Sequence, residues 1–239
     1  MVEVTYSLAD VLRLRISRDD LHDQLGQGLP AGTITLIEGP KGSGKSAILQ
    51  RMAFGFLSND HSVTCISTEL TVKDFIDQMY CLDYPIASWL LSGRLKFVPV
   101  YPLIGSSRNR KDFLGMLMSS RELFASDVII IDTFSSLVSN SLRGDENSIN
   151  VLGFFKKLAG MGKSVIISVD PEEVEGEALS PFESDSHVYL SLVVSQVGGV
   201  ISRTIMVKRF ANTQHRVSPM IGFRIEPNVG MVIEITSVV

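Results

Sequence analysis

Eight consecutive residues, GPKGSGKS at positions 39–46, have the composition and spacing of a phosphate-binding loop. Glycines let the backbone curl so that successive N–H groups point at phosphate oxygens, and a helix starting behind the loop adds its positive end. Lys45 can reach the β- and γ-phosphates of a nucleotide, and the Ser46 hydroxyl can ligate Mg²⁺. The predicted nucleotide-binding residues are Gly39, Pro40, Lys41, Gly42, Ser43, Gly44, Lys45, Ser46 and Ala47.

The flanking sequence favours this interpretation over a chance glycine-rich turn. A short apolar run, 33–38, precedes the loop, and apolar residues at helical spacing follow it over 45–57. We expect the Lys45 side chain to face solvent and to meet only phosphate.

Two acidic residues are candidates for the remaining chemistry. Asp132 ends the apolar run DVIIID, and beside a phosphate-binding loop such an Asp holds Mg²⁺, here through water. Taken alone, it would be a strand-end cap. Glu69 ends the strand-like segment that follows the loop helix, where a carboxylate can orient an attacking water. The alternative is a first-turn acid of the next helix, favourable with the helix dipole. The sequence leaves both interpretations of Glu69 open.

Alternating strands and helices must position these groups. This alternation predicts an α/β fold with a mostly parallel central sheet that is covered by helices on both faces. The expected strands are 33–38, 62–67, 95–100, 127–132 and 164–169, and the expected helices are 45–57, 71–82 with Thr71 as cap, 111–125 and 147–161.

The pattern changes after residue 170. The segment 170–185 holds seven acidic residues and two prolines, which is typical of a solvated loop. Two hairpin patterns follow, so the C-terminal third is expected to add antiparallel strands to the sheet. We interpret 1–239 as a single domain, with 1–17 as an N-terminal arm or strand and 187–239 as C-terminal β-hairpins.

Composition argues against several classes of protein, although it does not exclude a local basic groove. The net charge of −4 argues against a general nucleic-acid-binding surface, which needs a positive field. The two cysteines lack metal-ligand spacing, and a reducing cytosol suits them. Neither a signal peptide nor the ~20 apolar residues of a membrane span is visible. We therefore expect a soluble protein whose membrane role, if any, comes through partners.

Several segments together resemble the RecA/KaiC-like ATPases. They are GLPAG, GPKGSGKS, STELT, DTFSSL and VKRFANTQH. Within that superfamily, AFGFL, CISTELT with DFIDQM, and FVPVYPL are similar to the family of ATP-binding components of the archaeal flagellar motor, the archaellum. The resemblance covers nearly the whole chain. It implies a RecA-type core, ATP and Mg²⁺ as cofactors, and a cytoplasmic homo-oligomeric ring, expected to be a hexamer. It further implies docking at the cytoplasmic face of the membrane motor, beside the motor ATPase FlaI and the scaffold protein FlaX.

The resemblance also implies contacts between subunits. In KaiC-like rings a neighbour reaches the nucleotide with a K-x-R-x-x-x-H-like segment, which here offers Lys208, Arg209 and His215, with one residue more before the His. Cations at the end of a strand can instead simply protect its edge from aggregation. The family pattern has two adjacent glutamates where this chain has Glu69 and Leu70. We therefore expect weak ATPase activity at most, with the nucleotide acting as a conformational signal.

Two other functions are consistent with the same motifs. A DNA-recombinase paralogue would need basic channel loops, but segment 139–148 has one Arg against two acids and segment 171–185 has neither Lys nor Arg. No nucleic-acid partner is expected. A KaiC-like autokinase would need a hydroxyl near the γ-phosphate, and the sequence does not locate one.

Overall fold

A nine-stranded sheet forms the centre of the protein in the computed structural model, which describes residues 10–100, 115, 118–138, 145–174, 176–197 and 200–234. The strand order is β11-β10-β9-β8-β3-β7-β6-β4-β5, and the strands from β8 to β5 run parallel. The parallel strands are β3 (Ile34–Glu38), β4 (Val63–Ser67), β5 (Leu95–Pro99), β6 (Val128–Asp132), β7 (Ser164–Val169) and β8 (Val188–Val197). The antiparallel strands are β9 (Val200–Phe210), β10 (Met220–Glu226) and β11 (Gly230–Glu234). The predicted fold class is confirmed.

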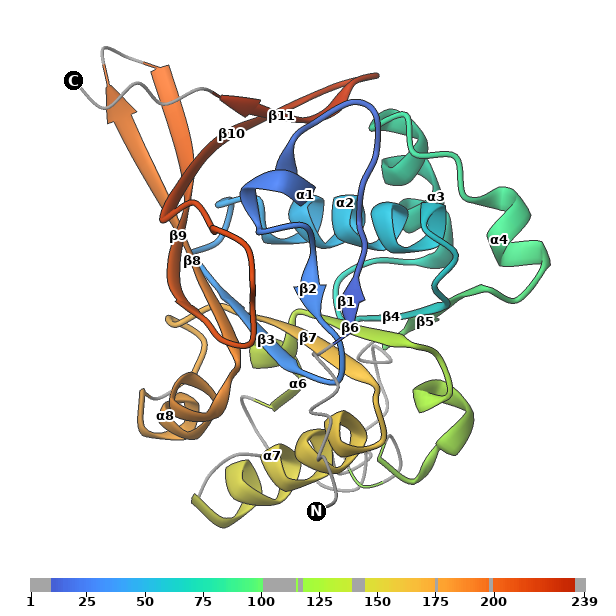
Figure 1. The fold of residues 1–239 in the computed structure, drawn as a ribbon. Helices are drawn as coiled ribbons and strands as arrows, with labels where there is room; N and C mark the ends of the chain where they lie inside the picture. The colour runs from blue at the N-terminus through green and yellow to red at the C-terminus, as the bar shows by residue number, and fades with distance from the viewer. Residues whose placement is uncertain are drawn as a thin grey trace, which may run out of the picture.

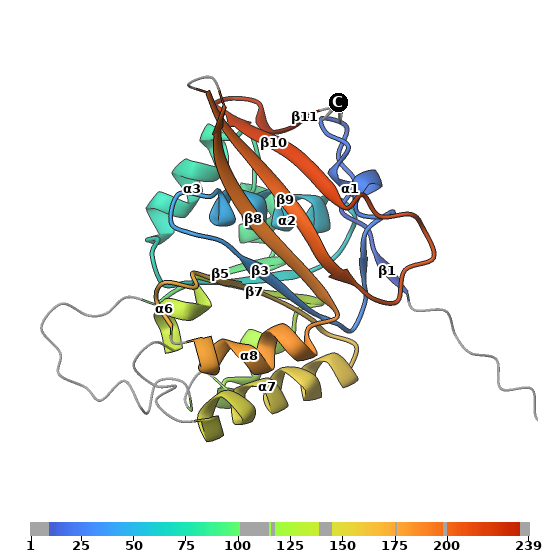
Figure 2. The ribbon, with the colours of Figure 1, turned by 90° about the vertical axis from the view of Figure 1, so that its left-hand side faces the viewer.

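Helices cover both faces of the parallel half (Figures 1 and 2). One layer holds α2 (Lys45–Ser58), α3 (Val72–Cys81) and α4 (Ala87–Leu91). The other holds the 3-10 helix η1 (Arg121–Phe124), α6 (Phe134–Val138), α7 (Asp145–Gly160) and α8 (Gly176–Asp185). Each layer packs its apolar side chains into its own core cluster against the sheet.

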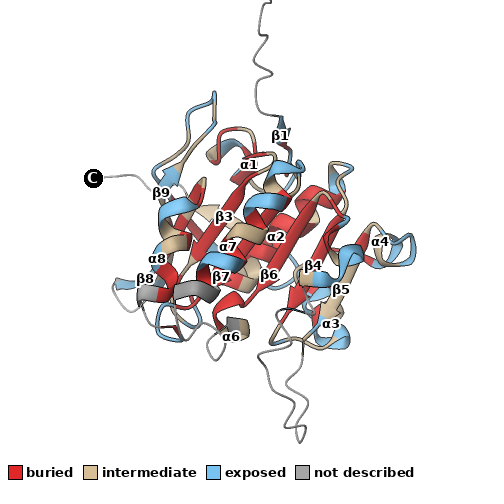
Figure 3. Ribbon diagram, turned by 90° about the horizontal axis from the view of Figure 1, so that it is seen from below, coloured by how far each residue is buried: buried red, intermediate tan, exposed pale blue. Residues whose placement is uncertain are grey.

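The central strands are buried from end to end because both their faces are covered. Every residue of β4, β6 and β7 is buried, as the red strands of Figure 3 show. This explains why their sequences are short, nearly continuous apolar runs rather than alternating patterns. A strand buried in this way holds the groups at its carboxyl end in fixed positions.

Helix α3 begins where the sequence predicts. The Thr71 hydroxyl accepts a hydrogen bond from the Asp74 N–H at 2.8 Å, and the Thr71 N–H donates to the Asp74 carboxylate. This capping box confirms Thr71 as the helix cap.

The acidic segment 170–185 is not a loop throughout, so that prediction is wrong. Its second half forms α8, in which Ala178, Leu179 and Phe182 are buried. Their helical spacing lets α8 pack against α7, while the acidic residues dominate the composition and conceal this pattern. Of the helix expected at 111–125, residues 111–114, 116 and 117 lie outside the described residues, and the described end includes η1.

The N-terminal segment 10–30 packs against α2. It forms β1 (Val11–Leu12), α1 (Leu21–Gln24) and β2 (Leu29–Pro30), and β1 pairs with β2. The fully buried Arg51 of α2 donates two hydrogen bonds to the Asp19 carboxylate, at 2.5 and 2.7 Å. Residues 1–9 of the expected arm lie outside the described residues. Within the described parts of the chain, no helix has the length and apolar character needed to cross a bilayer.

Candidate functional site: a phosphate-loop pocket at the carboxyl edge of the sheet

The loop between β3 and α2 has a backbone that needs glycine. Gly42 and Gly44 have φ angles of +80° and +98°, a region that other residues rarely adopt. A Cβ atom on Gly39 would come within 2.8 Å of Leu192 Cβ, so a side chain there would collide with β8. Helix α2 begins at Lys45, and its N-terminal end therefore faces the loop. Curled backbone and helix end together form a cradle suited to phosphate.

A cavity of about 220 Å³ lies against this loop. Loop residues and Ser46 form one wall, and the other walls come from Glu69, Thr133, Asp170, Glu173, Arg203 and Ile225. The carboxyl ends of β4, β6 and β7 meet at this edge of the sheet, which is the usual ligand-binding edge of open α/β sheets. The structure therefore brings the predicted loop and Glu69 together in one cavity.

Lys45 does not face solvent, so that part of the prediction is wrong. Its side chain is only 8% exposed, and its Nζ atom donates to the carbonyl oxygens of Gly39 at 2.6 Å and Pro40 at 3.0 Å. It also lies 3.5 Å from Asp170 Oδ2. The curled loop turns its own carbonyl groups toward the ammonium, which spacing alone does not reveal. Lys45 nevertheless lines the cavity, where a phosphate can reach it.

Asp132 lies at the end of β6 as predicted, and its side chain is buried. Its Oδ1 atom accepts hydrogen bonds from Ser168 Oγ at 2.7 Å and from Thr133 Oγ1 at 3.4 Å. Asp132 and Ser46 both line a second, smaller cavity of about 20 Å³. Cys65 lines it too, and burial followed by the charge of Asp132 raises the pKa of its thiol to about 12.

The donors at this position suit magnesium. Among the described residues, no three His, Cys, Asp or Glu side chains gather as a protein-only metal site. Mg²⁺ commonly takes one or two protein oxygens together with waters and substrate phosphates, and Ser46 and Asp132 supply oxygens of that kind. Within the described parts of the chain, the buried Ser43 Oγ and Arg203 Nε are among the side-chain atoms without a hydrogen-bond partner. Such atoms at the loop and cavity fit a site that a phosphate ligand completes.

Glu69 lies in the turn between β4 and α3, and it is exposed. It accepts a hydrogen bond from Thr133 Oγ1 at 3.2 Å at the cavity wall. The acid in the first turn of α3 is Asp74, and Glu69 precedes the Thr71 cap by two residues. The interpretation of Glu69 as a first-turn helix acid is therefore wrong, while its role toward an attacking water stays a prediction.

Three charged cavity residues were missed by sequence reasoning: Asp170, Glu173 and Arg203. Asp170 follows the apolar strand SVIISV just as Asp132 ends VIIID, so the same signal could have identified it. Arg203 offers no such signal, because it lies within β9. The strand register alone places it opposite Val194 of β8 and Phe223 of β10, and the Phe223 ring lies beside Gly44.

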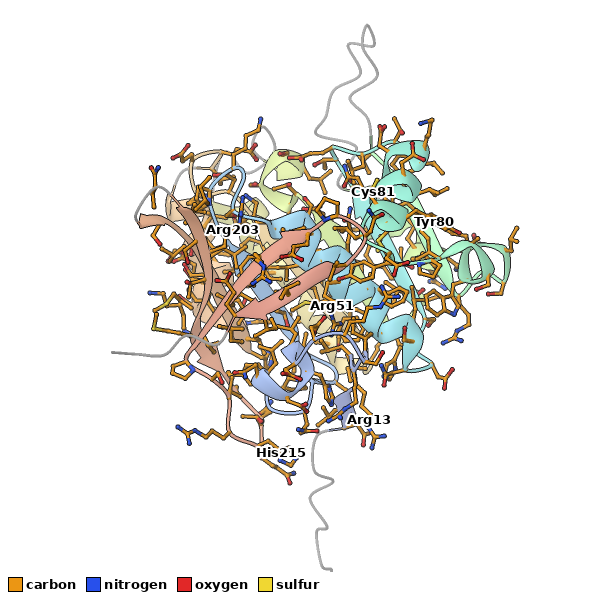
Figure 4. The ribbon with its side chains drawn as sticks, turned by 90° about the horizontal axis from the view of Figure 1, so that it is seen from above. Arg13, Arg51, Tyr80, Cys81, Arg203 and His215 are labelled. Atoms are coloured by element: carbon orange, nitrogen blue, oxygen red, sulfur yellow. The ribbon has the colours of Figure 1, made fainter. Side chains whose placement is uncertain are left out.

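The three residues predicted to contact a neighbouring subunit do not line the cavity of their own chain. Arg209 donates hydrogen bonds to the carbonyl oxygens at the end of α8, those of Glu183, Ser184 and Ser186, at 2.8–2.9 Å. Lys208 and His215 are exposed, and Figure 4 shows His215 well apart from Arg203. The register between β8 and β9 passes from Tyr189–Arg209 to Leu190–Val207, so Lys208 is the extra residue of a β-bulge.

Comparison with known proteins agrees with this fold. The model of the family "ATPase: KaiC" matches residues 18–237. The archaeal flagellar ATP-binding protein FlaH of Methanocaldococcus jannaschii is 36% identical over 97% of this chain and 99% of its own length. The FlaH of Methanococcus voltae is 31% identical over 95% of this chain and 98% of its own length.

Solved structures give the same result. The crystal structure of the flagellar accessory protein FlaH from M. jannaschii matches with a TM-score of 0.88 and 35% identity, over 95% of this chain and 100% of that one. A KaiC-like protein from Pyrococcus horikoshii matches with a TM-score of 0.74 over 95% of this chain and 100% of its own, and at 16% identity shows the fold alone. Fold and loop thus define a KaiC-type ATPase domain. Within that class, the chain belongs to the family of the archaeal flagellar ATP-binding protein FlaH, which confirms the resemblance seen in the sequence.

Proposed function

We propose that this protein is an ATP-binding, nucleotide-regulated component of the archaellum motor and its assembly platform, which hydrolyses ATP slowly or not at all. One observation carries the proposal: a glycine-dependent phosphate loop, with Lys45 at the cavity, in a chain whose relatives are named archaeal flagellar ATP-binding proteins. The loop N–H groups and Lys45 would bind the phosphates, and Ser46 and Asp132 would hold Mg²⁺, the latter through water. When bound, the metal neutralises phosphate charge.

The arrangement of carboxylates supports slow hydrolysis. Among the described residues, three carboxylates line the cavity, but Asp170 is paired with Lys45 and Glu173 accepts hydrogen bonds from Ser135 and Ser136. Glu69 is therefore the acid proposed to orient a water, and the Thr133 hydroxyl holds it at the cavity wall. The adjacent residue, Leu70, packs against the apolar core instead of supplying a second carboxylate. A single, exposed carboxylate is a weaker device for activating water than a pair of them in a closed site. ATP would therefore serve mainly to stabilise the state that binds it better.

We further propose that the protein forms a homo-oligomeric ring, expected to be a hexamer, on the cytoplasmic face of the membrane. The supporting observation is the separation between cavity and cations. Arg203 lines the cavity of its own chain, whereas Lys208 of the same strand is exposed and does not line that cavity. A contact made by the cavity of one copy with Lys208 or His215 of the next is head-to-tail, and such contacts form a ring where the rotation between copies closes. FlaI and FlaX are the proposed partners of this ring.

The test is to measure binding, hydrolysis and assembly on one sample. Parent and Lys45→Ala proteins are titrated with ATP–Mg²⁺, assayed for phosphate release, and sized in ATP, in ADP and without nucleotide. We expect Lys45→Ala to weaken ATP binding by ~1.5–3 kcal/mol or more, because it loses a charge-assisted contact. Thermal unfolding, with the exposed Lys73→Ala as a matched variant, checks the fold. ATP binding by Lys45→Ala as tight as by the parent would refute the site, and fast phosphate release would refute the regulatory role.

A further inference from the structure

The ammonium group of Lys45 already has an anionic partner within the protein. Its Nζ atom lies 3.5 Å from Asp170 Oδ2, and both side chains are only 8% exposed. A phosphate-loop lysine is the group that reaches the β- and γ-phosphates of a nucleotide. Nucleotide phosphate and the Asp170 carboxylate therefore require the same ammonium.

The local structure holds Asp170 in this position. Asp170 directly follows β7, and its backbone N–H donates to Ser135 Oγ at 2.9 Å. One carboxylate oxygen, Oδ1, accepts the backbone N–H of Glu172 at 3.1 Å. The other, Oδ2, is the one that faces Lys45. Because the turn satisfies the first oxygen and the strand end fixes the backbone, the second oxygen is aimed at the phosphate loop.

We propose that Asp170 is an internal competitor of nucleotide phosphate for Lys45, and that it thereby sets nucleotide affinity. This inference rests on the proposed function, since it assumes that phosphate binds at Lys45. Asp170 also lines the cavity and its side chain is buried, so a bound phosphate lies near a like charge that water screens poorly. Of the three contacts described for the Lys45 ammonium, the one to Asp170 is the longest, so on this proposal it is the contact that phosphate displaces, and the carboxylate then loses its cation.

The same turn connects the competition to the rest of the chain. Glu173 accepts hydrogen bonds from Ser135 Oγ at 2.8 Å and Ser136 Oγ at 2.7 Å, both on α6. Ser135 Oγ therefore joins the Asp170 backbone to Glu173. When phosphate displaces Asp170, the turn 170–173 loses its bond to the loop while keeping its bonds to α6. The turn 170–173, which leads into α8, therefore changes its contacts when a nucleotide occupies the site.

The decisive variant is Asp170→Asn, with Glu172→Gln as its matched control. Both remove one negative charge from the same turn, but the exposed Glu172 side chain does not line the cavity. We expect Asp170→Asn to bind ATP–Mg²⁺, ADP–Mg²⁺ and pyrophosphate about tenfold more tightly, a change of ~1.4 kcal/mol. Glu172→Gln should bind each ligand as the parent does. Titration calorimetry provides the measurement.

Three outcomes overturn the inference: unchanged binding by Asp170→Asn, weaker binding, or equal tightening by both variants. Weaker binding would mean that Asp170 helps to hold the ligand. The parent protein offers a second test that needs no variant. When saturating ATP–Mg²⁺ displaces Asp170, the Glu172 amide should exchange its hydrogen faster, and unchanged protection contradicts the proposal. If Lys45→Ala still binds ATP normally, the proposed function fails; if it does not and Asp170→Asn binds like the parent, only this inference fails.

Discussion

The parallel and antiparallel halves of the sheet differ in what surrounds them. Strands β6 and β7 are buried along their whole length between two layers of helices. The β8–β9 hairpin projects beyond the helices in Figures 1 and 2. Its successive residues Val193 and Val194 point to opposite faces, yet they are 45% and 40% exposed. The parallel half is thus a platform that fixes the phosphate loop and the acidic residues of the cavity, whereas the exposed end of the hairpin is free to contact other molecules.

If this contrast holds, damage to the platform should cost the most stability. We predict that Asp19→Ala lowers the free energy of unfolding by ~3–5 kcal/mol, because it leaves the fully buried Arg51 on α2 without its anion. The exposed neighbouring variant Asp20→Ala should change it by less than about 0.5 kcal/mol. Chemical denaturation measures both. Equal stabilities of the two variants would show that the N-terminal segment does not brace the platform.

The platform should also carry the metal-dependent part of nucleotide binding. Asp132→Asn keeps the shape of the side chain but removes its charge, so we expect ATP binding in Mg²⁺ to weaken at least about tenfold. Binding measured in EDTA should change little. Equal losses with and without Mg²⁺ would assign Asp132 a structural role, through its hydrogen bond from Ser168.

The antiparallel half should affect assembly more than binding. Lys208→Ala should leave ATP binding to the single subunit nearly intact but weaken ATP-driven assembly, since a contact in trans makes the nucleotide part of the interface. ADP should promote assembly less than ATP. Light scattering with each nucleotide makes the comparison, and the exposed Lys157→Ala on α7 controls for loss of a surface cation. If Lys208→Ala assembles like the parent, the contact in trans is refuted. The expected edge protection does not replace it, because β9 lies between β8 and β10 and is not an edge strand.

The smallest effect concerns pH and the N-terminal segment. Burial, and then the charge of Arg15, lowers the pKa of His22 from its ordinary value of 6.5. The folded state therefore favours neutral His22, and the unfolded chain binds the proton more readily. The free energy of unfolding should accordingly be highest above pH 6.5 and fall as the pH drops below it. His22→Gln should make this decline shallower in denaturation measured from pH 7.5 to 5. An unchanged slope would show that other groups cause it, such as His61 or His187, whose pKa values burial also lowers.

Local sequence predicts the platform well and the hairpin side of the cavity poorly. The phosphate loop is a contiguous motif, so its residues predict it directly. Asp132 ends a buried strand that the sequence shows as a continuous apolar run. Arg203 reaches the cavity only through the pairing of β9 with β8 and β10, which local sequence does not encode. The exposure of Lys45 was mispredicted because its loop contacts are backbone carbonyls, which carry no residue signature. Helix α8 was missed because acidic composition outweighed the spacing of three apolar residues.

The β-bulge at Lys208 separates the tasks of two adjacent cations. Side chains alternate along a strand, so one extra residue reverses the face that each later residue occupies. Arg209 therefore stays in register with Tyr189 and caps α8, while Lys208 has no cross-strand partner on β8. The side chain at position 208 therefore does not have to pack against a paired residue of β8. Evolution can change this residue to suit a binding partner without re-optimising the fold, because the flanking pairs Val207–Leu190 and Arg209–Tyr189 do not depend on its side chain.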